Sequence, residues 1–402
     1  MNNKKNNSEL QNNDKFTTHN SQLITKKVPH LRFSEFEGEW EEKKTIDIAP
    51  LQRGFDLPTS DVISGNYPVV YSNGVLRKHN KYKVKAPGIV TGRSGTIGKI
   101  TFIEEDFWPH NTSLWITDFF DNDPKFIYYF YIKFRLNRYS AGSTVPTLNR
   151  NDVHIVKKRI PHQAEQTKIA TFLTAVDKRI TLLKKKKDKL EQYKKGIRQK
   201  IFSQEIRFKN KNGNDFPDWE EKTLIEVSKI IGGGTPDTTI AEYWDGIHSW
   251  LTPTEIKSKY IFKSQRTITS LGLNKSSAKL LPIGSLLFTS RATVGDVGIA
   301  VYECSTNQGF QSFIVNEKCN NEFLYYWIKH HKKQFIRRSS GSTFIEISKT
   351  EISKIKISLP SIKEQQKIAS FLSSIDKYIE KVGIQIDDSV KFKQGLLQRM
   401  FV

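Results

Sequence analysis

A segment with helical periodicity occurs twice in this 402-residue chain, and its two copies start 199 residues apart. The match runs without a gap from 161–202 to 360–401, and 16 of the 42 aligned pairs are identical. A period of this length indicates two copies of a domain-sized unit rather than a solenoid of short repeats. Such a chain can place two similar sites on a pseudo-two-fold object, and this duplication constrains fold and function more than any other feature.

Apolar residues in both copies recur at alternating steps of four and three, the pattern of a coiled coil. Lys187 and Lys194 in the first copy, and Ser389 and Lys393 in the second, fill the polar positions of this seam. We therefore predict two long helices that pair as an antiparallel coiled coil. A helix pair inside a larger core is the alternative, but the outer faces carry too much charge for full burial. The apolar seam residues are Ile169, Leu173, Val176, Ile180 and Leu183 in the first copy, and Ile368, Leu372, Ile375, Ile379 and Val382 in the second.

The charge of the chain favours a nucleic-acid partner. The formal net charge is +22 and the pI is about 9.7. Residues 157–200 hold 15 Lys or Arg against four Asp or Glu. A basic stretch beside a structured domain is the usual electrostatic signature of phosphate binding. A solvated surface would explain the lysine run 184–187 equally well by itself, but the whole chain favours nucleic acid.

Composition excludes several other classes. Two cysteines, Cys304 and Cys319, supply neither a disulfide framework nor a four-ligand zinc site, which suits a reducing cytoplasm. The chain has no run of 18 apolar residues and no apolar signal core near its start, so we expect neither membrane insertion nor secretion. Residues 1–27 are rich in Asn, Lys and Ser and are expected to be disordered.

The rest of the chain is predicted to fold as four blocks: a domain at 28–158, a helix at 159–205, a second domain at 206–358 and a closing helix at 359–402. Each domain contains strand-like apolar runs punctuated by glycine, which predict an α+β fold with a curved, mostly antiparallel sheet. The expected strands are 67–71, 88–91 and 114–117 in the first domain and 285–289, 297–301 and 313–315 in the second, with helices at 125–138 and 321–337.

Landmarks also pair between the two domains. Segment 36–43 resembles 216–222, 87–93 resembles 282–291, and 140–144 resembles 339–343. The sequences between these landmarks diverge strongly. Two similar helices that carry two different domains suggest one frame presenting two specificities.

This organisation resembles the specificity subunit of type I restriction-modification systems. The resemblance covers essentially everything after the first 27 residues. It is carried by the block order, the helix starts Pro-x-x-x-Glu-Gln-x-x-Ile-Ala-x-Phe-Leu at Pro161 and Pro360, the segment Arg53-Gly54-Phe55-Asp56-Leu57-Pro58 and the loop Gly92–Gly98. Gly232-Gly233-Gly234-Thr235-Pro236 followed by Tyr243-Trp244 is similar to a common opening of that family's second recognition domain.

The resemblance implies two target-recognition domains, each of which reads one half of a bipartite, asymmetric site in double-stranded DNA. It further implies that the helices set the spacer and dock two methyltransferase (modification) subunits, which motor–nuclease (restriction) subunits then join. The chain itself is expected to be non-catalytic and to hold no metal or cofactor. S-adenosylmethionine, ATP and Mg would belong to the partner subunits.

Two other functional classes would also contain some of these features: a stand-alone DNA-modifying enzyme and a coiled-coil adaptor that binds only protein. The first lacks a catalytic constellation, because the chain has no Asn/Asp-Pro-Pro-Tyr/Phe box and the loop Gly92–Lys99 has the wrong spacing for a phosphate loop. A nuclease pattern of Asp218 with Glu255 and Lys257 is interpreted as structural, and His330 and His331 are expected at the surface. The second class leaves the divergent basic domains unexplained.

The residues predicted to contact DNA are polar side chains in glycine-containing loops, because Arg, Asn and Gln read base edges while Lys, Ser and Thr mostly bind phosphates. Arg93 and Arg291 are expected at equivalent places in the two domains, which favours a positioning or structural role for both. The candidates are Ser72, Asn73, Lys78, Arg93, Ser94, Thr96 and Lys99 in the first domain, and Thr235, Thr238, Thr254, Lys257, Arg291, Thr293 and Thr343 in the second.

Overall fold

The computed structural model describes residues 16–18, 27–142, 145–341 and 345–402. The chain divides into two compact units. Unit 1 consists of 1–185 and 383–402, and unit 2 consists of 186–382. Most of the expected disordered tail lies outside the described residues. Phe16–Thr18 differs from that expectation, because it forms strand β1 and pairs antiparallel with β2, Leu31–Phe33.

Unit 1 contains two small sheets and a covering helix. The larger sheet is antiparallel, and its strand order is β4-β10-β7-β8. A second sheet, β6-β5-β9, includes one parallel pair, β5 with β9. Helix α2, Pro124–Phe134, packs its aromatic side chains into the core against β7 and β8. The strands are β4 Leu51–Arg53, β5 Tyr67–Tyr71, β6 Gly74–His79, β7 Gly88–Gly92, β8 Ile100–Ile103, β9 Trp108–Pro109 and β10 Ser113–Ile116.

Unit 2 has the same arrangement with one strand added. Its larger sheet has the order β15-β22-β19-β20-β17, and its smaller sheet β18-β16-β21 again contains one parallel pair, β16 with β21. Helix α7, Asn321–Arg337, packs on β20 as α2 packs on β8 in unit 1. The strands are β15 Ser228–Gly232, β16 Trp244–Leu251, β17 Tyr260–Ile261, β18 Arg266–Ile268, β19 Leu286–Phe288, β20 Val297–Ala300, β21 Cys304–Thr306 and β22 Gln311–Val315.

Smaller elements repeat between the units as well. In unit 1, β3, Glu41–Lys44, pairs with β13, Lys157–Ile160, and the matching pair in unit 2 is β14, Glu220–Thr223, with β23, Lys356–Leu359. Short helices α1 and α3 correspond to α5 and α8. Their bounds are Thr45–Ile48, Arg150–His154, Leu224–Val227 and Lys349–Ser353, and a helix α6, Ser270–Asn274, follows β18 in unit 2. The predicted α+β class with mostly antiparallel sheets and an internal repeat is confirmed.

The predicted strands and short helices appear close to their expected positions. The strands expected in the first domain are β5, β7 and β10, and those in the second are β19, β20 and β22. The helix expected at 321–337 is α7, whereas that expected at 125–138 ends early. Arg135 adopts a left-handed conformation with φ of 56°, which ends α2 and starts a 3-10 turn at Leu136–Tyr139.

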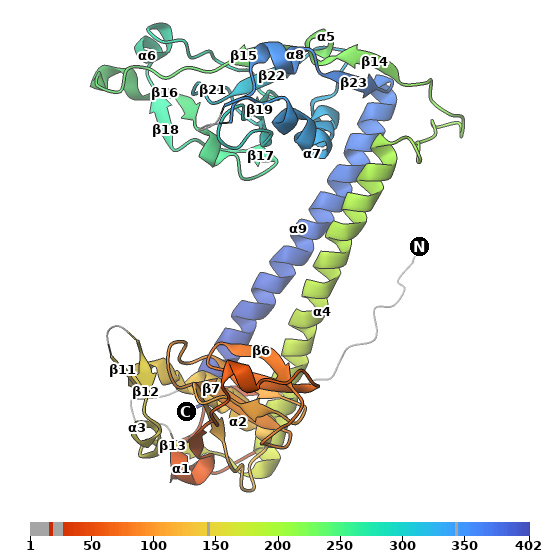
Figure 1. Cartoon of the computed structure of the whole chain (residues 1–402). Coiled ribbons are helices and arrows are strands. Elements are labelled where there is room, and N and C mark those ends of the chain that lie inside the picture. The colour runs from red at the N-terminus through yellow and green to blue at the C-terminus, as the bar shows by residue number, and fades with distance from the viewer. Residues whose placement is uncertain (1–15, 19–26, 143–144, 342–344) are drawn as a thin grey trace, which may run out of the picture. The chain divides into compact units, whose positions relative to one another are not determined.

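The two long helices are α4, Gln163–Phe202, and α9, Ile362–Arg399. Within each unit, part of α4 lies beside part of α9 (Figure 1). In unit 1, Ile169 and Leu173 of α4 share a core with Met400 and Leu396, so the helices run antiparallel there. In unit 2, Ile201 shares a core with Ile368 and Leu372 in the same sense. The ten apolar seam residues named above are buried or half-buried.

A matched ion pair links the helices inside each unit. Lys393 lies 2.7 Å from Asp177 in unit 1, and Lys194 pairs with Asp376 in unit 2. The two pairs are related by the repeat, since each residue has its counterpart 199 positions away. Tyr129 donates to Asp177 at 2.8 Å and Tyr326 donates to Asp376 at 2.6 Å. Two of the three lysines predicted as polar seam members, Lys194 and Lys393, therefore neutralise half-buried carboxylates.

The repeated Glu-Gln of the helix starts ties each long helix to its unit. Glu165 is fully buried and accepts both hydrogen bonds of an Arg32 guanidinium, at 2.9 and 2.8 Å, and the indole N–H of Trp40 at 3.3 Å. In unit 2, Arg207 and Trp219 donate to Glu364 in the same way. A buried carboxylate is stable only when such partners compensate for its lost hydration.

The neighbouring glutamine fixes the start of the covering helix. Gln166 donates to the carbonyl oxygen of Pro161 and accepts from the backbone N–H of Asp123, the N-cap of α2. Gln365 makes the same two contacts with Pro360 and with Asn320, the N-cap of α7. The repeated motif thus has a structural reason, because it joins each long helix to the short helix that covers a sheet.

Reversing one charge of the inter-helix ion pair should destabilise unit 1. We expect Asp177→Lys or Lys393→Asp to lower its free energy of unfolding, because each places like charges together in a half-buried seam. The double variant restores an ion pair with opposite polarity and should recover part of the loss. A double-mutant cycle measured by urea unfolding should give a coupling on the order of 0.5–3 kcal/mol. Additive losses would mean that the pair does not couple the helices.

Candidate nucleic-acid interface

Each unit contains a long basic segment that is almost free of acidic residues. Residues 62–103 of unit 1 include seven Lys or Arg and no Asp or Glu, and residues 246–295 of unit 2 include seven Lys or Arg and only Glu255. Both segments build the smaller sheet and enter the larger one. Acidic side chains would repel phosphates, so this bias makes both segments candidates for a nucleic-acid surface. The cations are Arg77, Lys78, Lys81, Lys83, Lys85, Arg93 and Lys99 in unit 1, and Lys257, Lys259, Lys263, Arg266, Lys275, Lys279 and Arg291 in unit 2.

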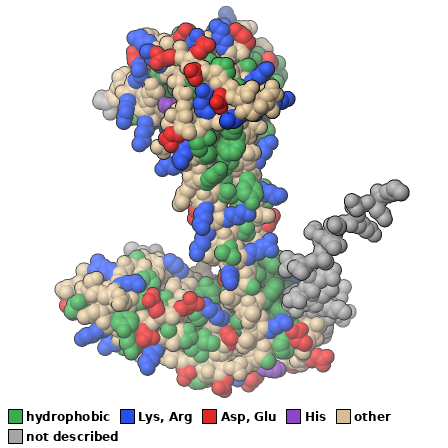
Figure 2. Space-filling model, turned by 90° about the vertical axis from the view of Figure 1, so that its right-hand side faces the viewer, with side chains coloured by type: hydrophobic (Ala, Val, Ile, Leu, Met, Phe, Trp, Pro, Cys, Tyr) green, Lys and Arg blue, Asp and Glu red, His purple; other side chains and the backbone are tan. Residues whose placement is uncertain are grey.

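Lys and Arg side chains are also spread along the long helices. Figure 2 shows them along α4 and α9, with hydrophobic side chains gathered between them. The exposed apolar residues there are Leu182, Ile384 and Phe392 in unit 1 and Tyr193, Ile362 and Tyr378 in unit 2. This mixture of exposed apolar and basic side chains fits a surface that another macromolecule covers.

The single acid of the unit 2 segment is engaged internally. The Glu255 carboxylate accepts from the backbone N–H and the hydroxyl of Thr252, at 2.7 and 2.9 Å, and from the backbone N–H of Gln265 at 2.8 Å. Asp218 pairs instead with Arg207 at 3.3 Å. The two carboxylates of the nuclease-like pattern thus serve separate structural contacts, as the sequence interpretation held.

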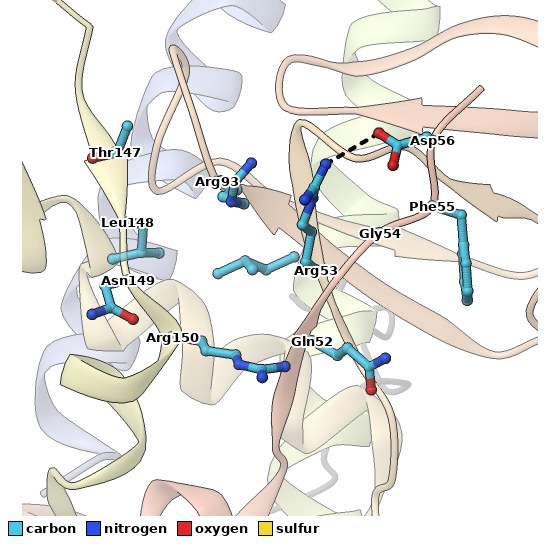
Figure 3. A pocket seen from close by; sticks show the side chains of 11 residues that line it. Gln52, Arg53, Gly54, Phe55, Asp56, Arg93, Thr147, Leu148, Asn149 and Arg150 are labelled. Atoms are coloured by element: carbon cyan, nitrogen blue, oxygen red, sulfur yellow. Dashed lines mark hydrogen bonds and ion pairs between the residues drawn. The ribbon is translucent and has the colours of Figure 1, made fainter. Parts of the chain in front are cut away.

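A cavity of about 690 Å³ opens at one end of the larger sheet of unit 1 (Figure 3). Three arginines reach it from three elements: Arg53 from β4, Arg93 from the loop after β7, and Arg150 from the start of α3. Hydrogen-bond donors therefore dominate its polar lining. The complete lining is Gln52, Arg53, Gly54, Phe55, Asp56, Arg93, Leu114, Thr147, Leu148, Asn149 and Arg150.

Asp56 is the only acid in this cavity, and its charge is compensated. The carboxylate accepts from the Asn111 side-chain amide and from Arg53 at 3.1 Å. The Asn111 hydrogen bond is the main reason that the pKa of Asp56 lies below its ordinary value, and Arg53 adds to this effect. Asp56 therefore stays ionised and balances Arg53, while Arg93 and Arg150 leave a net positive charge. Such a lining suits acceptor-rich groups, either phosphate oxygens or the O6/N7 edge of guanine.

Most predicted contact residues of the first domain lie in two adjoining loops. Ser72 and Asn73 form the turn between β5 and β6, and the Lys99 ammonium donates to the Asn73 carbonyl oxygen. In the second loop, the backbone N–H groups of Arg93 and Ser94 donate to the Thr112 carbonyl oxygen.

The loop after β7 closes on itself through its glycine. A Cβ on Gly92 would meet the Thr96 carbonyl oxygen at 1.7 Å, so only glycine fits there. Thr96 itself is exposed. Lys78 is also exposed, but it lies toward the end of β6 away from the turn, opposite Pro68.

The predicted residues of the second domain are more scattered. Thr235 hydrogen-bonds to Gln308 in a loop held by the indole N–H groups of two tryptophans, since Trp250 donates to Gly234 and Trp244 donates to Asp237. These indole hydrogen bonds give a structural reason for the glycine-rich motif 232–236 and for Trp244, the tryptophan that follows it. The remaining candidates Thr238, Thr254, Lys257, Arg291 and Thr293 are exposed, whereas Thr343 lies outside the described residues.

The expected equivalence of Arg93 and Arg291 is wrong. Strand-like pairing places Ser94 opposite Thr147 in unit 1 and Arg291 opposite Glu346 in unit 2, so Ser94 is the counterpart of Arg291. The backbone agrees, because Leu148 donates to Arg93 whereas Ile347, its repeat counterpart, donates to Ser290. The two loops differ in length between their landmarks, which shifted the sequence alignment by one residue.

This correction separates the roles of the two arginines. Arg291 donates to the Glu346 carboxylate at 2.6 and 2.9 Å, so its charge is neutralised within unit 2. Arg93 donates only a 3.3 Å hydrogen bond to the Asn111 carbonyl oxygen among the contacts described, and it lines the open cavity. The backbone of this loop is paired in the same way in both units, but its arginine is neutralised in unit 2 and lines an open cavity in unit 1.

A second expectation is also corrected, because His330 and His331 are half-buried rather than surface residues. His330 stacks on Phe202 with ring centroids 5.1 Å apart, and His331 stacks on Trp327 at 4.3 Å. Burial lowers the pKa of His330 to about 4 and also lowers that of His331. His330 thus packs α7 against α4, and His331 packs against Trp327 of the same helix.

Six polar residues of the cavity were not predicted as contacts: Gln52, Arg53, Asp56, Thr147, Asn149 and Arg150. They come from segments about 100 positions apart, which only the sheet and α3 bring together. Arg53 belonged to a motif that carried the family resemblance but was not singled out as a contact. The acid-free segment 62–103 was the available signal for the surface as a whole.

A family model for the type I restriction modification DNA specificity domain matches residues 37–192 and again 217–387. The chain belongs to this family. The two matches cover both units and confirm the recognition made from the duplicated helix starts.

Known relatives agree with this assignment. The type I restriction enzyme MjaIX specificity subunit of Methanocaldococcus jannaschii is 35% identical over 207 residues, which span 50% of this chain and 48% of that protein. The putative MjaX specificity subunit of the same organism is 27% identical over 325 residues, or 75% and 74% of the two chains. The match to the first relative thus spans about half of its length.

Solved structures share the fold. The S subunit of a type I restriction-modification system from M. genitalium superposes with a TM-score of 0.61 at 16% identity, covering 93% of this chain and 99% of that one. A chain from a structure of type I R-M complex assembly and conformational transition gives 0.58 at 15% identity, covering 90% and 97%. In the part of the chain that the structure describes, no helix is both long and apolar enough to span a bilayer.

Proposed function

We propose that this specificity protein is the DNA-recognition subunit of a type I restriction-modification complex, in which each unit reads one half of a bipartite, asymmetric site. One observation carries the proposal. The two units share the order of four strands in the larger sheet, the parallel pair of the smaller sheet and the covering helix, yet their basic, acid-poor surfaces have different sequences. A common frame with two unlike surfaces suits the recognition of two unlike half-sequences.

Within unit 1, the proposal assigns DNA contacts to the arginine-lined cavity and the adjoining loops. Arg93 and Arg150 would supply charge-assisted donors, while Gln52 and Asn149 could read an adenine edge. Asn73 and Lys99 would contact the backbone beside the cavity. In unit 2, Thr235, Thr238, Thr254, Lys257 and Thr293 remain proposed contacts, and Arg291 becomes a positioning residue because Glu346 holds it.

The long helices are proposed to set the spacer between half-sites and to dock two methyltransferase subunits. Their exposed apolar side chains would be covered by these partners, and motor–nuclease subunits would join the resulting core. S-adenosylmethionine, ATP and Mg would bind to the partners. The proposed place of action is the cytoplasm, where such a complex meets DNA.

DNA binding should depend strongly on salt. Each neutralised phosphate contributes a slope of about −0.9 to log K against log salt, so several contacts per unit predict a slope steeper than about −5. The measurement is fluorescence anisotropy of the full chain with its methyltransferase partner on a labelled duplex, at a series of salt concentrations. An affinity that stays constant from low to moderate salt would contradict the DNA-binding proposal.

The proposed function is tested by expressing the chain with and without a type I methyltransferase subunit in cells free of methylation. Methylation-sensitive sequencing should then find one bipartite sequence modified, and only when both proteins are present. A protein adaptor would give no sequence-specific modification, and a stand-alone enzyme would modify DNA without the partner.

A further inference from the structure

The hairpin β5–β6 of unit 1 carries two exposed apolar residues just after its turn, Val75 and Leu76, which together are called its tip. Val69 pairs with Arg77 and Val70 pairs with Val75, so Leu76 is the extra residue of a β-bulge. A bulge interrupts the alternation of a strand and can turn a side chain outward. Leu76 is 59% exposed and Val75 is 46% exposed.

The stretch of chain that contains this tip is basic and free of acid. Arg77 and Lys78 follow Leu76 directly on β6, and Lys99 lies against the turn at Asn73. The nearest acids in sequence are Asp61 and Glu104, because 62–103 contains none. An apolar tip between cations and without carboxylates is complementary to duplex DNA, which offers apolar base faces between rows of phosphates.

A glycine turn and several hydrogen bonds hold the tip in place. Gly74 has φ of +116°, a conformation that a residue with a Cβ rarely adopts, and this sharp turn fixes how β6 begins. The Lys99 ammonium donates to the Asn73 carbonyl oxygen and lies 3.1 Å from where a Cβ on Gly74 would be. On the other side, the Val70 carbonyl oxygen accepts from the His110 N–H at 2.9 Å and the Ser113 hydroxyl at 3.2 Å. A tip held in this way can contact a ligand without a change in its backbone conformation.

We infer that the tip of the β5–β6 hairpin enters a groove of duplex DNA, where Leu76 is inserted as a wedge that partly unstacks one base step. Val75 contacts the neighbouring base, and Arg77, Lys78 and Lys99 bind the flanking phosphates. This inference rests on the proposed function and extends it, because part of the specificity of unit 1 then comes from how easily a step opens. Pyrimidine–purine steps open most readily, so the wedge favours one of them in its half-site.

The test uses the full chain bound with its methyltransferase partner to a duplex that contains the methylated sequence. 2-Aminopurine is placed at successive positions of each half-site, because its fluorescence rises when a base is unstacked. The methyltransferase flips its own target base in each half-site, so that signal is common to all variants, and wild type should raise the signal at one further step of a single half-site. Leu76→Ala should lose most of that increase and bind about tenfold more weakly, the effect expected for one base contact. Leu76→Phe keeps a large apolar wedge and should preserve the increase.

Phe120→Ala is the matched control. Phe120 is an exposed apolar residue of the same unit, at 55%, but its neighbours in the chain include Asp118 and Asp121. It should leave both the fluorescence and the affinity unchanged. Thermal melting of each variant without DNA checks that unit 1 remains folded, which the exposure of both side chains favours.

The outcomes separate the inference from the proposed function. If no sequence is methylated, the proposed function fails and the inference fails with it. If methylation is sequence-specific but wild type and Leu76→Ala give equal fluorescence, the wedge is wrong and the recognition function stands. Loss of binding on thymine-to-uracil replacement, without any unstacking, would show that Leu76 reads a methyl group and would also overturn the wedge.

Discussion

Exchanging residues 28–158 for the corresponding domain of a relative is expected to change one half of the methylated sequence completely and to leave the other half intact. The reason is that the basic surface and the cavity of unit 1 lie within this stretch, whereas unit 2 contributes no residue to either. The readout is the sequence modified in cells that express the chimera with its methyltransferase partner.

The donor domain has to bring the contacts that join unit 1 to the long helices. Arg32 and Trp40 bind the buried Glu165, and Tyr129 binds the half-buried Asp177, so a donor without these three side chains would leave Glu165 unpaired and Asp177 with Lys393 alone. A chimera from such a donor is the control, and it should fail through instability rather than through altered reading. A simultaneous change in both halves of the methylated sequence would mean that the units do not read independently.

The long helices were predictable because their information is local and repeated. A heptad pattern over five to six heptads identifies a paired helix from one segment alone, and α4 and α9 lie inside the expected ranges. Strands such as β5 and β7 were predictable for a related reason, since they are apolar runs that end at turns. The ion pairs Asp177–Lys393 and Lys194–Asp376 were not, because periodicity marks a polar seam position without naming its partner.

Non-local contacts account for what sequence reasoning missed at the candidate site. The cavity combines β4, the loop after β7 and α3, and no local pattern shows that Arg53 and Arg150 meet. The partners of Glu165 and Glu364 are equally distant, since Arg32 lies 133 positions from the first and Arg207 lies 157 from the second.

The mistaken pairing of Arg93 with Arg291 has another cause. Aligning two arginines that each follow a buried strand is natural, but the backbone pairing at Thr147 and Glu346 shifts the match by one residue. Loop length, which residue type does not reveal, decided this case. Single contact residues are therefore harder to predict from the sequence than the fold class, and proposing them depends more on the structure.

Removing the buried carboxylate of unit 1 is expected to have the largest effect on stability. Glu165→Ala leaves the Arg32 guanidinium in a site where its side chain is 11% exposed, and it removes the acceptor of the Trp40 indole N–H. Breaking a buried ion pair by deleting one partner costs about 3–5 kcal/mol. A domain is stable by only about 5–15 kcal/mol, so unit 1 should be close to unfolding. Urea unfolding of the full chain gives the size of the loss.

The unit that loses stability distinguishes a local role of each buried glutamate from a general destabilisation of the chain. Hydrogen exchange should show lost protection in unit 1 for Glu165→Ala and in unit 2 for Glu364→Ala, because each carboxylate binds the Arg and Trp of its own unit. Glu42→Ala is the matched control. Glu42 also pairs with an arginine, Arg159 at 3.1 Å, but its side chain is 41% exposed, so its loss should cost less than about 1 kcal/mol. Equal losses for Glu42→Ala and Glu165→Ala would show that burial of the repeated glutamate does not hold the helix start in place.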